Sequence, residues 1–99
     1  MFRHVVMWNF KDGLTAEEKK TTGAKVKAGL EGLKQHIPGV VEIKVIVNEH
    51  PKSNKEIMLD STFEDENAFN AYKVHPEHEK VAVLTREVLQ DRACVDYVE

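Results

Sequence analysis

Apolar residues alternate with a period of two in four stretches of the chain and recur at helical spacing between them. The first strand is predicted over residues 4–10, which are rich in β-branched and aromatic side chains. Further strands are predicted over residues 40–48, 56–63 and 93–98. The first strand is apolar on both faces, whereas a strand with one wet face alternates more cleanly. We therefore expect both of its faces to be covered.

The segments between these strands carry the start and stop signals of helices. Thr15 and Glu18 form a predicted capping box that begins a long helix, and residues 38–39, Pro-Gly, predict its end. Acidic residues over 64–67 favour the start of a second helix through its dipole. Pro76 is expected to end that helix and to occupy the first turn of another.

The order strand, helix, strand, strand, helix, strand predicts one α+β domain over residues 1–99 with the ferredoxin-like βαββαβ fold. In that fold, helices cover one face of a four-stranded antiparallel sheet. The other face stays bare, yet it carries Ile46 and Met58 as well as apolar residues of the first strand. Because an exposed apolar sheet face on a small domain indicates a partner, we expect a homodimer whose two sheets pack into a β-sandwich or barrel.

Composition narrows the partners further. The 99 residues are 41% hydrophobic and 31% charged, with a net charge of −3. Scattered basic residues and a negative net charge argue against nucleic acid or an anionic membrane surface as a partner. The sequence has no apolar segment of the length of a membrane span and no leader-like segment before the first strand. With a single cysteine, Cys94, these features predict a cytoplasmic protein.

Candidate chemistry is concentrated in Tyr72-Lys73-Val74-His75-Pro76-Glu77-His78. The proline places Tyr72 and His78 at a helix junction, where both side chains can turn towards one cavity. His75 is interpreted as a junction or cap residue. A metal pair of His75 with His78 is the alternative, although Pro76 disrupts the regular helix that would align the two ligands. From the residues alone, Tyr72 and His78 also fit a purely structural packing role.

The chain resembles the stress-responsive dimeric α/β-barrel (Dabb) domain family over nearly its whole length. The resemblance rests on residues 4–11 (His-Val-Val-Met-Trp-Asn-Phe-Lys), residues 62–65 (Thr-Phe-Glu-Asp), the Tyr-x-x-His-Pro-x-His signature of residues 72–78, and residues 95–97 (Val-Asp-Tyr). The resemblance implies a dimer whose two sheets form a barrel, which agrees with the expectation from the apolar sheet face.

The family includes a plant polyketide cyclase that closes a linear polyketide by an intramolecular aldol condensation, without a metal or an organic cofactor. By resemblance, its catalytic histidine and tyrosine match His78 and Tyr72. The aspartate on the last strand that supports that histidine matches Asp96, and a pocket-lining histidine matches His4. The resemblance therefore implies catalytic roles for His78, Tyr72 and Asp96, a substrate-binding role for His4, and no metal or cofactor.

The expected lining departs from that enzyme. Val6, Trp8 and Leu59 are expected to bind the substrate together with the histidine of the first strand. Trp8 is bulkier than the aliphatic residue typical of its position, and Gly23 and Lys27 replace aromatic residues of the first helix. A long alkyl tail of a substrate would lack the aromatic residues that enclose it. The resemblance therefore extends to the polar site residues more than to the substrate.

These residues suit proton abstraction beside a carbonyl group. A histidine such as His78 is a suitable base near neutral pH, Asp96 would fix its tautomer, and Tyr72 would donate to the enolate oxygen. The ligand would be a small apolar carbonyl compound, in a site beside the dimer-forming sheet. Two alternatives remain: a non-catalytic dimeric stress protein with a filled interior, and, from fold analogy alone, a monooxygenase-like dimeric barrel.

Overall fold

The computed structural model describes residues 1–99 and confirms the ferredoxin-like βαββαβ order, with the second helix divided in two. The elements in chain order are β1 (Phe2–Phe10), α1 (Ala16–Gly32), the 3₁₀ turn η1 (Leu33–Gln35), β2 (Val40–Val47), β3 (Ile57–Phe63), α2 (Glu66–Lys73), α3 (Pro76–Val88) and β4 (Leu89–Val98). None of the helices combines the length and the apolar character that a membrane crossing requires.

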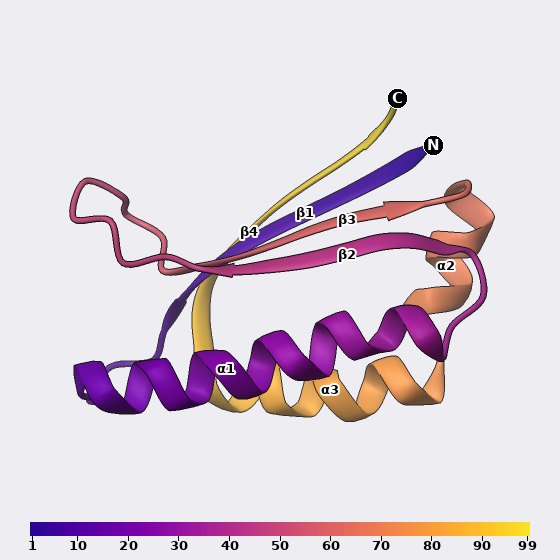
Figure 1. The fold of residues 1–99 in the computed structure, drawn as a ribbon. Helices are drawn as coiled ribbons and strands as arrows, with labels where there is room; N and C mark the ends of the chain where they lie inside the picture. Colours follow the sequence, from indigo (N-terminus) through magenta and orange to yellow (C-terminus); the bar gives the residue numbers. More distant parts are fainter.

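The four strands form one antiparallel sheet in the order β2-β3-β1-β4. Figure 1 shows α1 and α3 lying together along one face of this sheet, with α2 at one end. No element covers the opposite face, as the sequence predicted. We refer to the two sides as the helix-covered face and the open face.

Strand β1 crosses the middle of the sheet and separates the core from the open face. Every second residue of β1 is buried against the helices; these residues are Phe2, His4, Val6, Trp8 and Phe10. The residues between them are half-buried on the open face. Ile46 of β2 pairs with Met58 of β3 on that same face, and both are half-buried. The alternation explains why β1 is apolar on both sides.

The junction before α3 has the form expected from the sequence. His75 is the N-cap of α3, and its Nδ1 accepts a hydrogen bond of 3.1 Å from the backbone N–H of Glu77. Pro76 follows in the first turn, where a missing N–H costs nothing. The capping box of Thr15 and Glu18 at the start of α1 is also present. These local signals depend on neighbouring residues only, and for that reason they could be identified in the sequence.

The last strand is longer than predicted. It begins at Leu89 rather than at residue 93, because α3 ends at Val88 and Leu89 already has extended backbone angles. The pairing of β1 with β4 shifts register between Met7 and Asn9, and Asp91 has a positive φ of 56°. A β-bulge therefore interrupts the alternation of apolar and polar residues over 89–92. For this reason the sequence pattern predicted the strand only from residue 93.

Candidate functional site

A cavity of about 620 Å³ lies between the helix-covered face of the sheet and α3. Its walls include the buried face of β1, the ends of α2 and α3, and the bulged start of β4. The residues expected from the sequence that line it are His4, Val6, Trp8, Leu59, Tyr72 and His78. All of these strand residues point to the helices, so the cavity lies beside the sheet on its helix-covered side.

Tyr72 and His78 meet in the wall of this cavity, with ring centroids 4.5 Å apart. Tyr72 lies in the last turn of α2 and His78 in the first turns of α3, so the cap at His75 and Pro76 folds the two rings together. Tyr72 is only 1% exposed. The helix break therefore brings both side chains to one cavity, as the position of the proline in the sequence predicted.

Both of these side chains have an unpaired polar atom. The Tyr72 hydroxyl and the His78 Nδ1 are buried and have no hydrogen-bond partner. Burial raises the pKa of Tyr72 far above its ordinary value, so its hydroxyl keeps the proton and can donate. Burial lowers the pKa of His78, against a weaker opposing effect of the Lys73 backbone, and favours the neutral imidazole. An unpaired buried polar group costs about 1–3 kcal/mol, so a ligand that pairs with these atoms would gain affinity.

Asp96 supports His4 and not His78, which corrects the pairing that the resemblance implied. The Nδ1 of His4 lies 2.5 Å from the carboxylate Oδ1 of Asp96. The register of β1 with β4 places these two residues directly opposite each other on the helix-covered face. His78 is on α3, and no hydrogen bond joins it to the carboxylate. The strand register thus decides which histidine Asp96 can reach.

The His4–Asp96 pair has shifted acidities on both sides. Burial lowers the pKa of His4 although Asp96 acts in the opposite direction. Burial alone would raise the pKa of Asp96, but hydrogen bonds from His4 and Cys94 outweigh it and lower that pKa. Asp96 is therefore ionised at neutral pH and accepts the Nδ1–H of His4. This leaves Nε2 of His4 as the acceptor nitrogen of the ring.

Cys94 completes a small polar cluster with His4 and Asp96. Its Sγ lies 3.4 Å from Oδ1 of Asp96 and 3.8 Å from Nδ1 of His4. Burial and the carboxylate of Asp96 raise the pKa of the thiol, so it stays protonated and donates to Asp96. The three side chains offer potential metal-ligand atoms within 4.8 Å of one another, but in this state they form a hydrogen-bonded network.

Several lining residues were not assigned to the site from the sequence. They are Leu30, Ala82, Thr85, Arg86, Leu89, Gln90, Asp91 and Arg92. The helical spacing of Ala82 and Thr85 relative to His78 was the signal that could have placed them on the same side of the helix. Asp91 and Arg92 gave no such signal because the bulge decides which way they point.

The stability of the protein is expected to fall as pH decreases through the titration range of its buried histidines. The pKa values of His4 and His78 are lowered in the folded protein relative to 6.5. Between the folded and unfolded pKa values the unfolded chain binds more protons, so the free energy of unfolding rises with pH in that window and levels off above it. Urea unfolding at about pH 7.5 and about pH 5.5 measures this change.

The variant His78→Gln should lose part of this pH dependence, because one of the two buried titrating groups is gone. The matched variant His50→Gln, at an exposed loop position, should keep all of it. An equal unfolding free energy of the unaltered protein at both pH values would contradict the assignment of neutral buried histidines.

Comparison with known proteins gives the family. Residues 2–99 match the stress responsive A/B barrel domain, Dabb. The chain belongs to the Dabb family. This confirms the resemblance inferred from the Tyr-x-x-His-Pro-x-His signature. No curated relative matches the chain.

Solved structures of other proteins share the fold over the whole chain. A dimeric protein of unknown function from Bacteroides fragilis is 31% identical, with a TM-score of 0.91 over 99% of this chain and 95% of its own. The hydroxynitrile lyase of Passiflora edulis is 17% identical, with a TM-score of 0.81 over 99% of this chain and 92% of its own. A putative antibiotic biosynthesis monooxygenase from Nitrosomonas europaea is 11% identical, with a TM-score of 0.76 over 100% of this chain and 98% of its own.

These likenesses carry different weight. At 17% and 11% identity, the lyase and the monooxygenase show that the fold is shared and nothing more. The Bacteroides fragilis protein and other neighbours are dimeric ferredoxin-like proteins. Neighbours of known dimeric state thus agree with the open apolar face of this sheet.

Proposed function

We propose that this Dabb protein binds a small, largely apolar carbonyl compound in the cavity and removes a proton from the carbon beside the carbonyl group. The observation that carries the proposal is that Tyr72 and His78, which line the cavity together, each have a buried polar atom without a hydrogen-bond partner. A filled interior, which the non-catalytic alternative predicted, would have no such space. The catalyst would need no cofactor, as in a cyclase-like or lyase-like reaction.

The two rings divide the chemistry between them. The proton of the Tyr72 hydroxyl would be donated to the carbonyl oxygen of the ligand and would stabilise the enolate as negative charge develops there. The neutral imidazole of His78 would accept the proton from the adjacent carbon. We assign the base to His78 because its ring packs against Tyr72, so that base and donor can reach neighbouring atoms of one small molecule.

Asp96 acts through His4 in this proposal. Its carboxylate fixes the Nδ1–H tautomer of His4 and leaves Nε2 as a hydrogen-bond acceptor for the ligand. Val6, Trp8 and Leu59 supply apolar contact surface around the carbonyl compound. The ring of Phe69, 4.6 Å from that of His4, helps to hold the histidine in place.

Solvent deuterium exchange tests the proposal without knowledge of the natural substrate. Acetophenone and cyclohexanone, incubated with the protein in deuterated buffer, are expected to take up deuterium beside the carbonyl at a rate that saturates with ketone concentration. Nuclear magnetic resonance follows the loss of the proton signal. Exchange no faster than that produced by the same concentration of free imidazole would contradict proton abstraction in the cavity.

We also propose that the chain forms a homodimer through the open face of its sheet. That face carries apolar residues of all four strands, among them Ile46, Met58, Met7 and Val95, and Val95 is 54% exposed. An ion pair of Arg3 with Asp60 lies among them, and the Nε of Arg3 is buried without a partner. Packing of two such faces would remove the apolar surface from water, which is the dominant favourable term in association.

Light scattering coupled to size-exclusion chromatography is expected to give twice the mass of the 11.3 kDa chain at micromolar concentration. Val95→Asp should shift the mass to that of one chain, because it places an unpaired charge in the proposed interface. Val83→Asp, at an exposed position of α3 on the other side of the molecule, is the matched control and should stay dimeric. A single-chain mass for the unaltered protein would contradict the dimer.

A further inference from the structure

One arginine at the mouth of the cavity has no acidic partner. Arg86 and Arg92 both line the cavity. The guanidinium of Arg86 is paired with the carboxylate of Glu79 at 2.8 Å. Arg92 takes part in no ion pair, although it lies close enough to His4, Cys94 and Asp96 to act on their pKa values, and its one side-chain contact of this kind is with the neutral thiol of Cys94. Arg92 is therefore the cationic side chain that remains available to a molecule in the cavity.

The β-bulge of β4 places Arg92 on the helix-covered face. Leu89 pairs with Phe10, and Ala93 pairs with Met7. Asp91 and Arg92 therefore share the position opposite Trp8. In a regular strand, residues three apart lie on opposite faces, but the extra residue brings Leu89 and Arg92 to the same face. Without the bulge, the guanidinium would be on the open face, away from the cavity.

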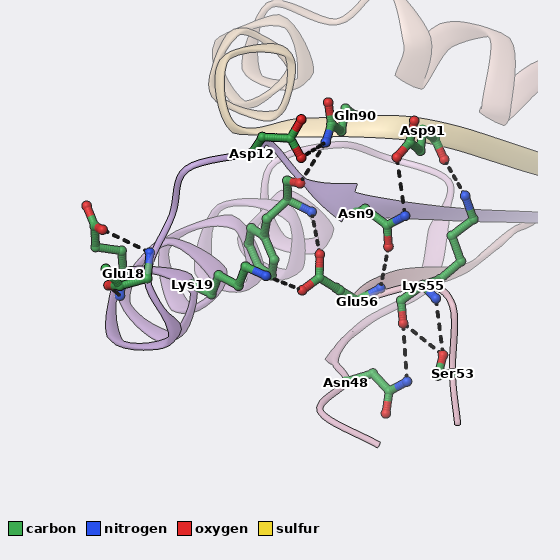
Figure 2. A network of polar contacts seen from close by, with 12 residues as sticks. Asn9, Asp12, Glu18, Lys19, Asn48, Ser53, Lys55, Glu56, Gln90 and Asp91 are labelled. Atoms are coloured by element: carbon green, nitrogen blue, oxygen red, sulfur yellow. Dashed lines mark hydrogen bonds and ion pairs between the residues drawn. The ribbon is translucent and has the colours of Figure 1, made fainter. Parts of the chain in front are cut away.

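A network of polar contacts holds the bulge in this form (Figure 2). The Asn9 side chain donates to the Asp91 carboxylate at 3.3 Å, and Lys55 donates to the Asp91 backbone carbonyl at 2.7 Å. Asp91 needs this support because its φ of 56° lies in the left-handed region. Figure 2 shows Asn9 and Lys55 approaching Asp91 from different parts of the chain. Contacts with residues far away in the sequence thus hold the backbone that directs Arg92 to the helix-covered face.

We propose that Arg92 binds a carboxylate at the mouth of the cavity, so that the ligand is a keto acid with its carbonyl oxygen at Tyr72 and its apolar body against Val6 and Trp8. This inference rests on the proposed function, because it assigns the second end of the same ligand. A guanidinium presents two parallel donors that match a carboxylate. The carboxylates of Asp91 and Asp96 lie nearby and repel negative charge. A singly charged carboxylate would therefore bind beside them better than a doubly charged phosphate.

Three compounds of one shape separate the two ends of the ligand. Benzoylpropionate carries both the ketone and the carboxylate, its methyl ester lacks the negative charge, and phenylbutyrate lacks the ketone. Isothermal titration calorimetry of the full-length chain gives a dissociation constant for each. Arg92→Gln is expected to weaken the binding of benzoylpropionate by about tenfold or more, and to leave the binding of the ester unchanged.

The matched control is Lys25→Gln, which removes one positive charge from an exposed position of α1 away from the cavity. It should change neither dissociation constant, whereas Arg92→Lys should retain part of the affinity for the acid. Equal affinity of the unaltered protein for the acid and the ester would overturn the inference, as would an equal loss of both in Arg92→Gln.

The same titrations distinguish failure of this inference from failure of the proposed function. If phenylbutyrate binds as well as benzoylpropionate, and both depend on Arg92, the carbonyl site is wrong and the carboxylate site stands. If the ester binds and the ketones exchange deuterium while Arg92 has no effect, the carbonyl site stands and the carboxylate site is wrong. Binding of none of the three compounds at millimolar concentration overturns both.

Discussion

Replacement of His78 by alanine is expected to slow deuterium exchange into acetophenone by about 10²–10⁴-fold, the usual contribution of a positioned general base. The imidazole lies in the cavity wall against Tyr72, and burial lowers its pKa, so it is neutral and able to accept a proton at neutral pH. No carboxylate holds its ring, which distinguishes it from His4. The measurement is the exchange rate at saturating ketone, followed by nuclear magnetic resonance.

Two controls separate this effect from damage to the fold. His50→Ala removes an exposed histidine of the β2–β3 loop and should leave the exchange rate unchanged. Tyr72→Phe should slow exchange while keeping or raising the free energy of unfolding, because the hydroxyl it removes is buried and unpaired. If His78→Ala keeps the full rate and His4→Ala loses it, the base is the histidine held by Asp96.

Replacement of Phe63 by alanine is expected to lower the free energy of unfolding by about 3–5 kcal/mol, the range for a buried phenylalanine. Phe63 is 0% exposed at the end of β3. Its ring centroid lies 4.8 Å from that of Tyr72 and 5.2 Å from that of Phe69. The substitution leaves an empty space beside the ring of Tyr72. The protein should therefore be less stable, and the Tyr72 hydroxyl should be held less firmly in place.

Urea unfolding at fixed protein concentration measures the loss, and the fixed concentration matters because a dimer would couple stability to association. Phe63→Leu is the matched control: it keeps most of the volume and should cost clearly less than the alanine variant. A loss below about 1 kcal/mol for Phe63→Ala would contradict this expectation and would show that neighbouring side chains collapse into the space left by the ring.

The cavity and the open face lie on opposite sides of β1, and this separation has a consequence for both proposals. His4, Val6 and Trp8 point to the cavity, whereas the residues between them point to the open face. A substitution on the open face such as Val95→Asp can therefore test the dimer without touching a side chain of the cavity.

The candidate site could be predicted from the sequence as a set of residues but not as a set of contacts. The Tyr-x-x-His-Pro-x-His signature identified Tyr72 and His78, and their meeting at a proline break follows from local geometry. The partner of Asp96 depended on the pairing of β1 with β4, strands far apart in the chain. Resemblance supplied the residue but assigned it to the wrong histidine.

The sequence by itself determined the order of the elements, the helix-covered and open faces of β1, the cap at His75 and the family. It could do so because hydrophobic period, capping and proline geometry act between near neighbours in the chain. Only the tertiary structure decided the side of the sheet on which the cavity lies, the His4–Asp96 contact and the direction of Arg92. Each of these depends on strand register, and a single extra residue at Asp91 changes the face of every residue beyond it.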